Sequence, residues 1–141
     1  MSNRIVAYTD GGARGNPGPA AIGIVIRYDG KEKKYGEAIG ETTNNIAEYQ
    51  AVIFALKKVK QLVGREEAKN REVEVYSDSE LVVRHMKGEF KVKNQVLKDY
   101  FVELYNLVQD FGDVSFTHIT RDENMGADKL VNEALDKTSL L

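Results

Sequence analysis

Short apolar runs alternate with turn residues at the start of the chain, a pattern typical of β-strands joined by tight connections. Strands are predicted at residues 4–9, ending at Asp10, at 20–28 and at 33–40. The glycine- and proline-rich residues 11–19 predict a loop, and Asp29–Gly30 predicts a hairpin turn. The third strand is polar, as an edge strand usually is. The chain therefore opens as an antiparallel meander.

After residue 42 the apolar positions follow the spacing of helices. A helix is predicted from Thr43 to about Val63, and Thr or Asn at 43–45 can cap its start. Further helices are predicted at residues 79–86, 95–111 and 127–135, strands at 72–77 and 114–119, a charged connector at 64–71 and a loop at 88–93. The order βββαβααβα predicts one α/β domain over residues 1–141. Its five-stranded mixed sheet has three antiparallel strands, then two parallel ones, with helices on both faces.

Composition narrows the class of protein. Hydrophobic residues make up 42% and charged residues 30%, which indicates a soluble globular protein rather than a disordered or membrane protein. Residues 1–4 offer no apolar stretch for a secretory signal, and the absence of cysteine excludes disulfides, zinc–thiolate sites and a cysteine nucleophile. We therefore expect a cytoplasmic monomer with no membrane association and no protein partner.

Four carboxylates stand where predicted elements begin or end. Asp10 follows the first strand, Glu48 lies one turn into the first helix, Asp78 follows the fourth strand and Asp128 starts the last helix. Such positions commonly meet at one edge of an α/β sheet. Because converging carboxylates repel one another, divalent cations that prefer oxygen ligands, such as Mg²⁺ or Mn²⁺, would stabilise them. Two ions ~4 Å apart could clamp the attacking and leaving oxygens of a phosphodiester.

Each acid also has an ordinary structural explanation. Asp10 before two glycines fits a turn, Glu48 and Asp128 fit the first turns of helices, and Asp78 fits a helix cap. The chain holds 22 Asp and Glu residues, so most of them must be solvated surface charges. The formal net charge of −2 is also unusual for a nucleic-acid-binding protein, although gathered carboxylates would lower it. Position alone leaves both interpretations open.

Four segments together resemble the signature motifs of the ribonuclease H type 1 family. They are TDGGARGNPGPAAIG from Thr9, TTNNIAEYQAVIFAL from Thr42, YSDSELV from Tyr76 and THITRDENMGADKLVNEAL from Thr117. They follow the order and approximate spacing of the family, so the resemblance covers nearly the whole chain. It implies an endonuclease that hydrolyses the RNA strand of an RNA–DNA hybrid and leaves 5′-phosphate ends. It also implies two Mg²⁺ ions per site, with Mn²⁺ as a substitute.

The resemblance assigns roles to particular residues. The four acids Asp10, Glu48, Asp78 and Asp128 match the metal-binding carboxylates of the family, and Gly11 is counted with them in the metal site. His118, ten residues before Asp128, matches a mobile histidine that helps product or metal leave. Arg121 could fill the same electrostatic role. A histidine at a strand end can equally be structural.

Four polar residues match substrate contacts of the family. Asn16, Asn44 and Asn45 match positions that touch the minor groove of the hybrid, where amides can pair with base edges and ribose hydroxyls without demanding a sequence. Thr43 matches a position that holds a phosphate of the DNA strand. Asn and Thr before a helix also serve as caps, and capping is compatible with binding.

Two departures indicate a compact form of the family. Glu41 stands where some members have a basic residue, and residues 85–98 lack a long tryptophan-rich protrusion, offering only Lys87, Lys91, Lys93 and Lys98. Whether duplex RNA is also cut stays open. A hybrid-binding module without activity and another nuclease of the superfamily are the competing hypotheses. The complete set of four acids favours the enzyme, and the Asn44–Asn45 pair with the Gly15–Gly18 loop argues against the other nuclease.

Overall fold

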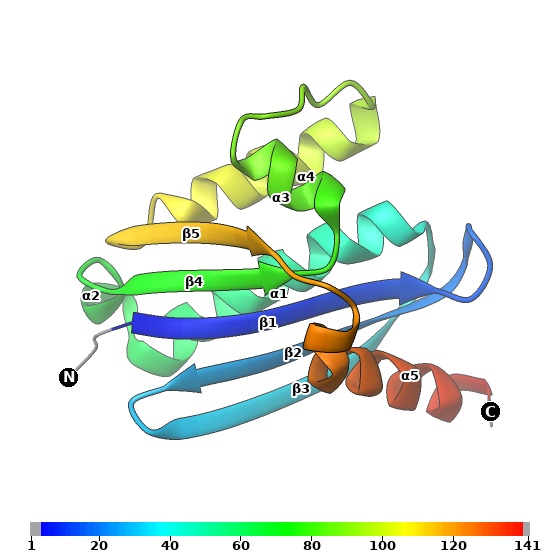
Figure 1. Ribbon diagram of the computed structural model, residues 1–141, viewed down its shortest axis with the longest axis horizontal. Helices are drawn as coiled ribbons and strands as arrows, with labels where there is room; N and C mark the ends of the chain where they lie inside the picture. The colour runs from blue at the N-terminus through cyan, green and yellow to red at the C-terminus, as the bar shows by residue number, and fades with distance from the viewer. Residues whose placement is uncertain (1–3, 140–141) are drawn as a thin grey trace.

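The computed structural model describes residues 4–139, apart from the side chain of Ser139, and a five-stranded mixed sheet forms its centre (Figure 1). The strands are β1 (Arg4–Ala13), β2 (Gly18–Tyr28), β3 (Lys31–Thr42), β4 (Glu72–Ser77) and β5 (Asp113–His118). Their order across the sheet is β3-β2-β1-β4-β5. β1 and β3 each pair with β2 antiparallel, whereas β4 pairs with β1 and β5 in parallel. The predicted sheet is therefore confirmed. The proposed span of 1–141 extends past the described residues at both ends.

Helices cover both faces of this sheet, as predicted (Figure 1). They are α1 (Asn44–Val63), α2 (Arg65–Ala68), α3 (Glu80–Met86), α4 (Gln95–Val108), the 3₁₀ turn η1 (Asp122–Asn124) and α5 (Met125–Ser139). α1 packs on β1 and β2 with α4 beside it, and α5 packs on β2 and β3 from the other side. Among the described residues, no helix is both long enough and apolar enough to cross a membrane.

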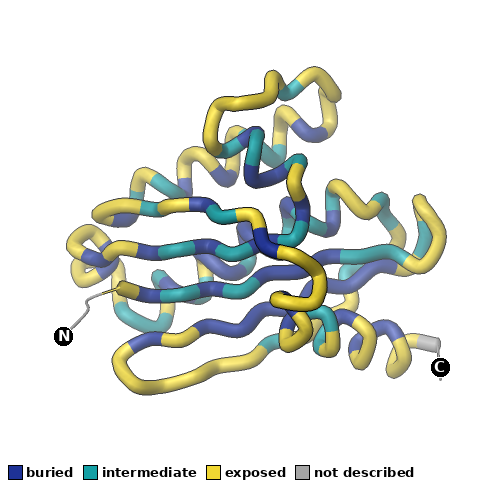
Figure 2. Tube along the Cα trace, viewed as in Figure 1, coloured by how far each residue is buried: buried dark blue, intermediate teal, exposed yellow. Residues whose placement is uncertain are grey.

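The main core lies between the sheet and α1. Strand residues that alternate along β1, β2 and β4, such as Ile5, Ile24 and Val75, meet the fully buried Tyr49 and Leu56 of α1. A smaller cluster, Ala21, Val131, Ala134 and Leu135, lies under α5. β3 is mostly exposed along its length, as expected of an edge strand (Figure 2). The burial of α1 fixes its position relative to β1, and hence the position of Glu48.

Several predicted boundaries are wrong. β1 continues to Ala13, so Asp10 lies inside the strand and residues 11–13 are not part of a loop. Their pairing with β2, Gly11 with Ile22 through Ala13 with Ala20, holds the two glycines extended. Residues 64–71 contain the short α2, and the helix predicted at 95–111 ends at Val108. The last helix begins at Met125 rather than at residue 127.

Two glycines let the helices approach the sheet. A Cβ atom added to Gly11 would lie 2.2 Å from the Ala47 carbonyl oxygen of α1, and one added to Gly23 would lie 2.2 Å from the Ala127 carbonyl oxygen of α5. Gly11 and Gly23 lie on adjacent strands, and Gly23 pairs with Asp10. The absence of side chains at these two positions therefore brings α1 and α5 close to the strand segment that carries Asp10.

The Gly23 contact predicts a stability difference between two glycine substitutions. Gly23→Ala should lower the free energy of unfolding by about 2 kcal/mol or more, because the added methyl meets backbone and α5 must shift. The matched control is Gly126→Ala, where the added Cβ would lie 3.6 Å from Val25 Cγ2 and helix propensity improves. Urea unfolding of both variants measures the effect. Equal stability of Gly23→Ala and the unmodified protein would contradict this packing account.

Candidate active site and metal centre

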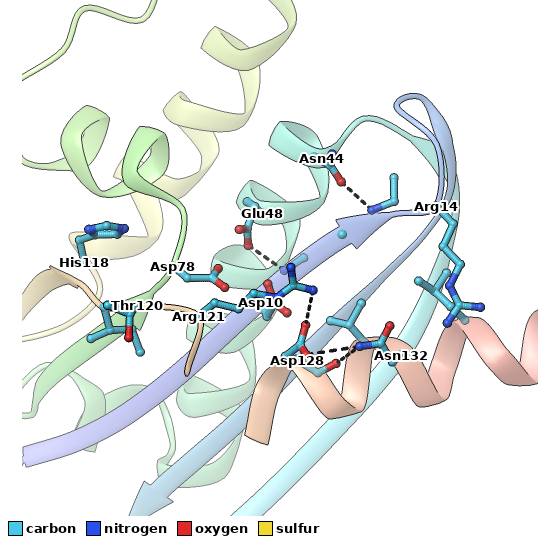
Figure 3. Close-up of a pocket in the computed structure, with 16 residues that line it drawn as sticks. Asp10, Arg14, Asn44, Glu48, Asp78, His118, Thr120, Arg121, Asp128 and Asn132 are labelled. Atoms are coloured by element: carbon cyan, nitrogen blue, oxygen red, sulfur yellow. Dashed lines mark hydrogen bonds and ion pairs between the residues drawn. The ribbon is translucent and has the colours of Figure 1, made fainter. Parts of the chain in front are cut away.

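Three carboxylates, from β1, α1 and the bend after β4, meet where the pairing of β1 with β4 ends. The parallel register ends with Thr9 opposite Ser77, so Asp10 and Asp78 follow side by side. Asp10, Asp78 and Glu48 of α1 each offer one oxygen, and these oxygens lie within 4.8 Å of one another (Figure 3). The spacing suits shared coordination of a divalent cation, because hard oxygen ligands are those that Mg²⁺ and Mn²⁺ prefer.

Glu48 is oriented by the backbone of β1. The Gly11 N–H donates a 2.7 Å hydrogen bond to Glu48 Oε1. This contact depends on the close approach of α1 that the missing side chain of Gly11 allows. Through its N–H, Gly11 therefore orients the carboxylate of Glu48.

Asp128, in the first turn of α5, reaches the same cleft from the opposite side of the sheet. Its Oδ1 lies 3.4 Å from Arg121 Nη2, and its Oδ2 lies 3.4 Å from Asn132 Nδ2. Asn132 Nδ2 also donates to the main-chain oxygen of Asp128 at 3.1 Å. The structure thus brings all four predicted acids into one cleft of about 710 Å³, with Asp128 at the margin of the tight group of three.

The electrostatics of the site reflect this crowding. Burial, followed by the charges of Asp78 and Asp128, raises the pKa of Asp10 to about 8. Burial also raises the pKa of Glu48, with Asp10 and Asp78 adding to it, and the Gly11 N–H opposes the rise. Without bound cations, the native fold therefore brings together carboxylates that resist ionisation, and a divalent cation would relieve this cost.

The predicted substrate residues connect the β1–β2 loop to the start of α1. Asn16 Oδ1 accepts from the Asn44 N–H at 3.0 Å, and Asn44 Oδ1 accepts from the Ala13 N–H at 2.8 Å. Thr43 is the N-cap of α1, where its hydroxyl accepts from the Ile46 N–H at 3.3 Å. Asn45 is exposed beside them. Asn44 lines the carboxylate cleft, whereas the other three lie outside its lining.

His118 and Arg121 both line the cleft, and Arg121 contacts Asp128. His118 is the last residue of β5, and Figure 3 shows it away from Asp128, whereas Arg121 lies between Asp78 and Asp128. The predicted strand and helix leave residues 120–126 as a loop, but η1 and α5 follow Arg121 immediately. Asn124 of η1 is buried and donates a 2.8 Å hydrogen bond to the Thr9 carbonyl oxygen, which fixes this segment beside Asp10.

Comparison with known proteins identifies the family. The model for the family described as "Reverse transcriptase-like" matches residues 8–134. Ribonuclease HI of Halobacterium salinarum is 40% identical over 135 residues, which are 94% of this chain and 65% of that protein. LC11-RNase H1 in complex with an RNA/DNA hybrid superposes with a TM-score of 0.89 at 47% identity, over 95% of this chain and 98% of that one. This chain belongs to the ribonuclease H type 1 family.

Further comparisons show how much of each relative this chain covers. The solved RNase H1 from Halobacterium salinarum gives a TM-score of 0.86 at 40% identity, over 95% of this chain and 98% of that chain. A bifunctional protein of Mycobacterium tuberculosis is 38% identical over 136 residues, which are 94% of this chain and 36% of that protein. The chain thus spans about a third to two thirds of the length of these curated relatives.

Three residues of this site are missing from the sequence prediction. Asn132 could have been found, because it lies four residues after Asp128 and therefore on the same helix face. Asn124 carries no signal beyond its place in the fourth motif. Arg14 lines the cleft from the β1–β2 loop, which the sequence presents only as a turn-rich stretch.

The raised pKa of Asp10 predicts how the stability of the metal-free protein depends on pH. Because the pKa of Asp10 is about 8 in the native state and near its ordinary value of 3.8 in the unfolded chain, the free energy of unfolding falls as pH rises between these two values. Asp10→Asn should remove much of this loss and raise the free energy of unfolding at pH 8 by at least about 1 kcal/mol.

Urea unfolding in chelator from pH 5 to pH 9 measures this effect. Asp99→Asn, which removes an exposed acid of α4, should leave the pH profile unchanged. Parallel profiles for Asp10→Asn and the unmodified protein would show that Asp10 is not crowded in the native state.

Proposed function

We propose that this chain is a monomeric, magnesium-dependent endonuclease that hydrolyses the RNA strand of RNA–DNA hybrids and leaves 5′-phosphate ends. The observation that carries the proposal is the approach of Asp10, Glu48 and Asp78 to within 4.8 Å, with Asp128 at the margin of the same open cleft. Family membership supports the reaction. The structure of LC11-RNase H1 with an RNA/DNA hybrid supports the substrate class.

The four acids would hold two Mg²⁺ ions, for which Mn²⁺ would substitute. Bound ions would supply an activated water and a counter-charge for the leaving oxygen. The chain contributes their placement: β1 and β4 present Asp10 and Asp78 in register, and the Gly11 N–H orients Glu48. Arg121 and Asn132 each contact one oxygen of Asp128 and so set its orientation.

Hybrid recognition would use the segment where the β1–β2 loop meets α1. In the contacts that the described residues make, Asn16 and Asn44 use their Oδ1 atoms, so their Nδ2 donors can reach acceptors in the minor groove. Asn45 is exposed next to them. The Thr43 hydroxyl accepts from the Ile46 N–H, so its own proton is available for a phosphate oxygen of the DNA strand.

A cleavage assay with strand-specific labels tests the proposed activity. Matched RNA–DNA, RNA–RNA and DNA–DNA duplexes are incubated with Mg²⁺, Mn²⁺, Ca²⁺ or chelator. We expect cleavage of the RNA strand of the hybrid with Mg²⁺ or Mn²⁺, and little turnover with Ca²⁺, whose looser coordination misplaces the nucleophile. The RNA–RNA arm decides whether duplex RNA is also cut. Full activity in excess chelator would contradict the metal mechanism.

The loss of cleavage rate on substituting each acid should depend on its place in the site. Asp10→Asn, Glu48→Gln and Asp78→Asn should each lower the cleavage rate by about 100-fold or more, because each removes a ligand from the tight group. Asp128→Asn should be milder, since Asp128 lies at the margin. Asp99→Asn serves as the control. Steady-state rates at fixed Mg²⁺ measure the series, and a full rate in Asp10→Asn would show that these acids do not hold the ions.

Arg121 should contribute more to turnover than His118. Arg121→Ala should slow turnover by about 10-fold or more and His118→Ala by less, with hybrid binding nearly unchanged, because Arg121 carries a permanent charge beside Asp128. Single-turnover and steady-state rates across pH measure both variants, and Arg65→Ala on α2 is the control. A larger loss in His118→Ala, with a pH dependence that disappears in that variant, would reverse the two roles.

A further inference from the structure

The cleft that holds the carboxylates continues past them, between the end of β1 and α5. Its extension, here called the α5 groove, is lined by Gly12, Ala13 and Arg14 on one side and by Val131, Asn132 and Leu135 on the other. Figure 3 shows Arg14 descending from the β1–β2 loop toward α5, on the side of Asp128 that faces away from His118. The proposed metal ligands lie outside this groove, which can therefore face a part of the substrate away from the scissile phosphate.

Charge in the α5 groove comes from one side chain. The α5 wall consists of Val131, Asn132 and Leu135 and supplies no cation, whereas Arg14 on the facing wall carries a guanidinium. Arg14 Nη2 contacts Asp136 Oδ1 at 2.7 Å, and both side chains are partly exposed to solvent. A guanidinium binds a phosphate with the same planar geometry that it uses for a carboxylate. Asp136 therefore binds a guanidinium N–H that a phosphate oxygen could bind instead.

The backbone at Arg14 is anchored, so the position of this cation is defined. The Arg14 N–H donates to the Pro19 carbonyl oxygen at 2.8 Å, and the preceding Ala13 N–H donates to Asn44 Oδ1 at 2.8 Å. Arg14 follows Asp10 by four residues of extended chain, a span of roughly 13 Å at the rise of a β-strand. A nucleic-acid strand rises ~3.4 Å per nucleotide along the helix axis, so this span covers at most about four nucleotides.

We propose that Arg14 binds the phosphodiester backbone of the cut strand a few nucleotides from the scissile phosphate, and that Asp136 competes with this phosphate for the guanidinium. The inference rests on the proposed function, because the groove is continuous with the carboxylates that would bind the scissile phosphate. In the free protein Asp136 holds Arg14 against α5. When hybrid binds, the phosphate takes the place of the Asp136 carboxylate, and Asp136 then repels the strand.

Hybrid binding in an Asp10→Asn background, which does not cut, measures both parts of the proposal. Adding Arg14→Gln should weaken hybrid binding about 5-fold or more at low salt. The negative slope of the logarithm of the association constant against the logarithm of the salt concentration should become shallower by about 0.9, the value for one lost phosphate contact. Adding Asp136→Asn should tighten binding about 2-fold or more, because the competing and repelling carboxylate is gone. In the double variant the Asp136→Asn gain should disappear.

A matched pair elsewhere on the surface provides the control. Arg27 and Glu32 form a similar exposed ion pair at 2.9 Å between β2 and β3, outside the lining of the cleft. Arg27→Gln and Glu32→Gln, measured in the same background, should change the affinity by less than about 2-fold. An effect as large as that of Arg14→Gln would show that any surface arginine contributes equally, and would overturn the assignment of Arg14.

Neutral phosphate analogues locate the contact. Hybrids with one methylphosphonate at successive positions are compared for binding to the Asp10→Asn protein with and without Arg14→Gln. The penalty of Arg14→Gln should vanish at one position of the cut strand within about four nucleotides of the scissile phosphate. A penalty that persists at every position, or vanishes only for the DNA strand, overturns the inference. If the unmodified protein cuts hybrid normally and Arg14→Gln has no effect on binding, the inference about Arg14 is rejected while the proposed function stands. If the unmodified protein cuts no hybrid, the proposed function is rejected.

Discussion

Mutual repulsion among Asp10, Glu48 and Asp78 is the constraint on which the site depends. Burial raises the pKa of both Asp10 and Glu48, and the charges of the neighbouring carboxylates add to the rise. The buried core provides the compensating free energy, because α1 and the first strands bury most of their apolar side chains against one another. A rigid scaffold can thus hold acids at distances that only bound cations would make favourable.

Close helix–strand contact transmits that rigidity to the site. α1 reaches β1 at Gly11 and α5 reaches β2 at Gly23, and a side chain at either position would collide with helix backbone. These two contacts lie on opposite faces of the sheet beside Asp10. Glu48 and Asp128 can therefore approach Asp10 from the two sides, while Asp78 arrives in register along β4.

Polar side chains then join the surface segments around the site to this scaffold. Asn16 and Asn44 connect the β1–β2 loop to α1, and Asn124 connects η1 to β1. Asn16 and Asn44 use only their Oδ1 atoms in these bonds, so each can stabilise the fold and also present its Nδ2 donor to a substrate. Structural and binding interpretations of these residues are therefore compatible.

The sequence by itself determined the element types and their order along the chain, because alternation in Glu72–Ser77 and helical spacing in α1 record which side chains are buried. It also singled out the four acids as candidates, whereas the order of the strands across the sheet came from the structure. The family resemblance connected those acids to a reaction. Only the tertiary structure decided that β1 continues through Gly11. Glycine has no side chain and little intrinsic preference for a strand, so the extended conformation there depends on pairing with β2. The tertiary structure also decided the contact of Arg14 with Asp136, because the two residues lie 122 positions apart and only the packing of α5 on the sheet brings them together.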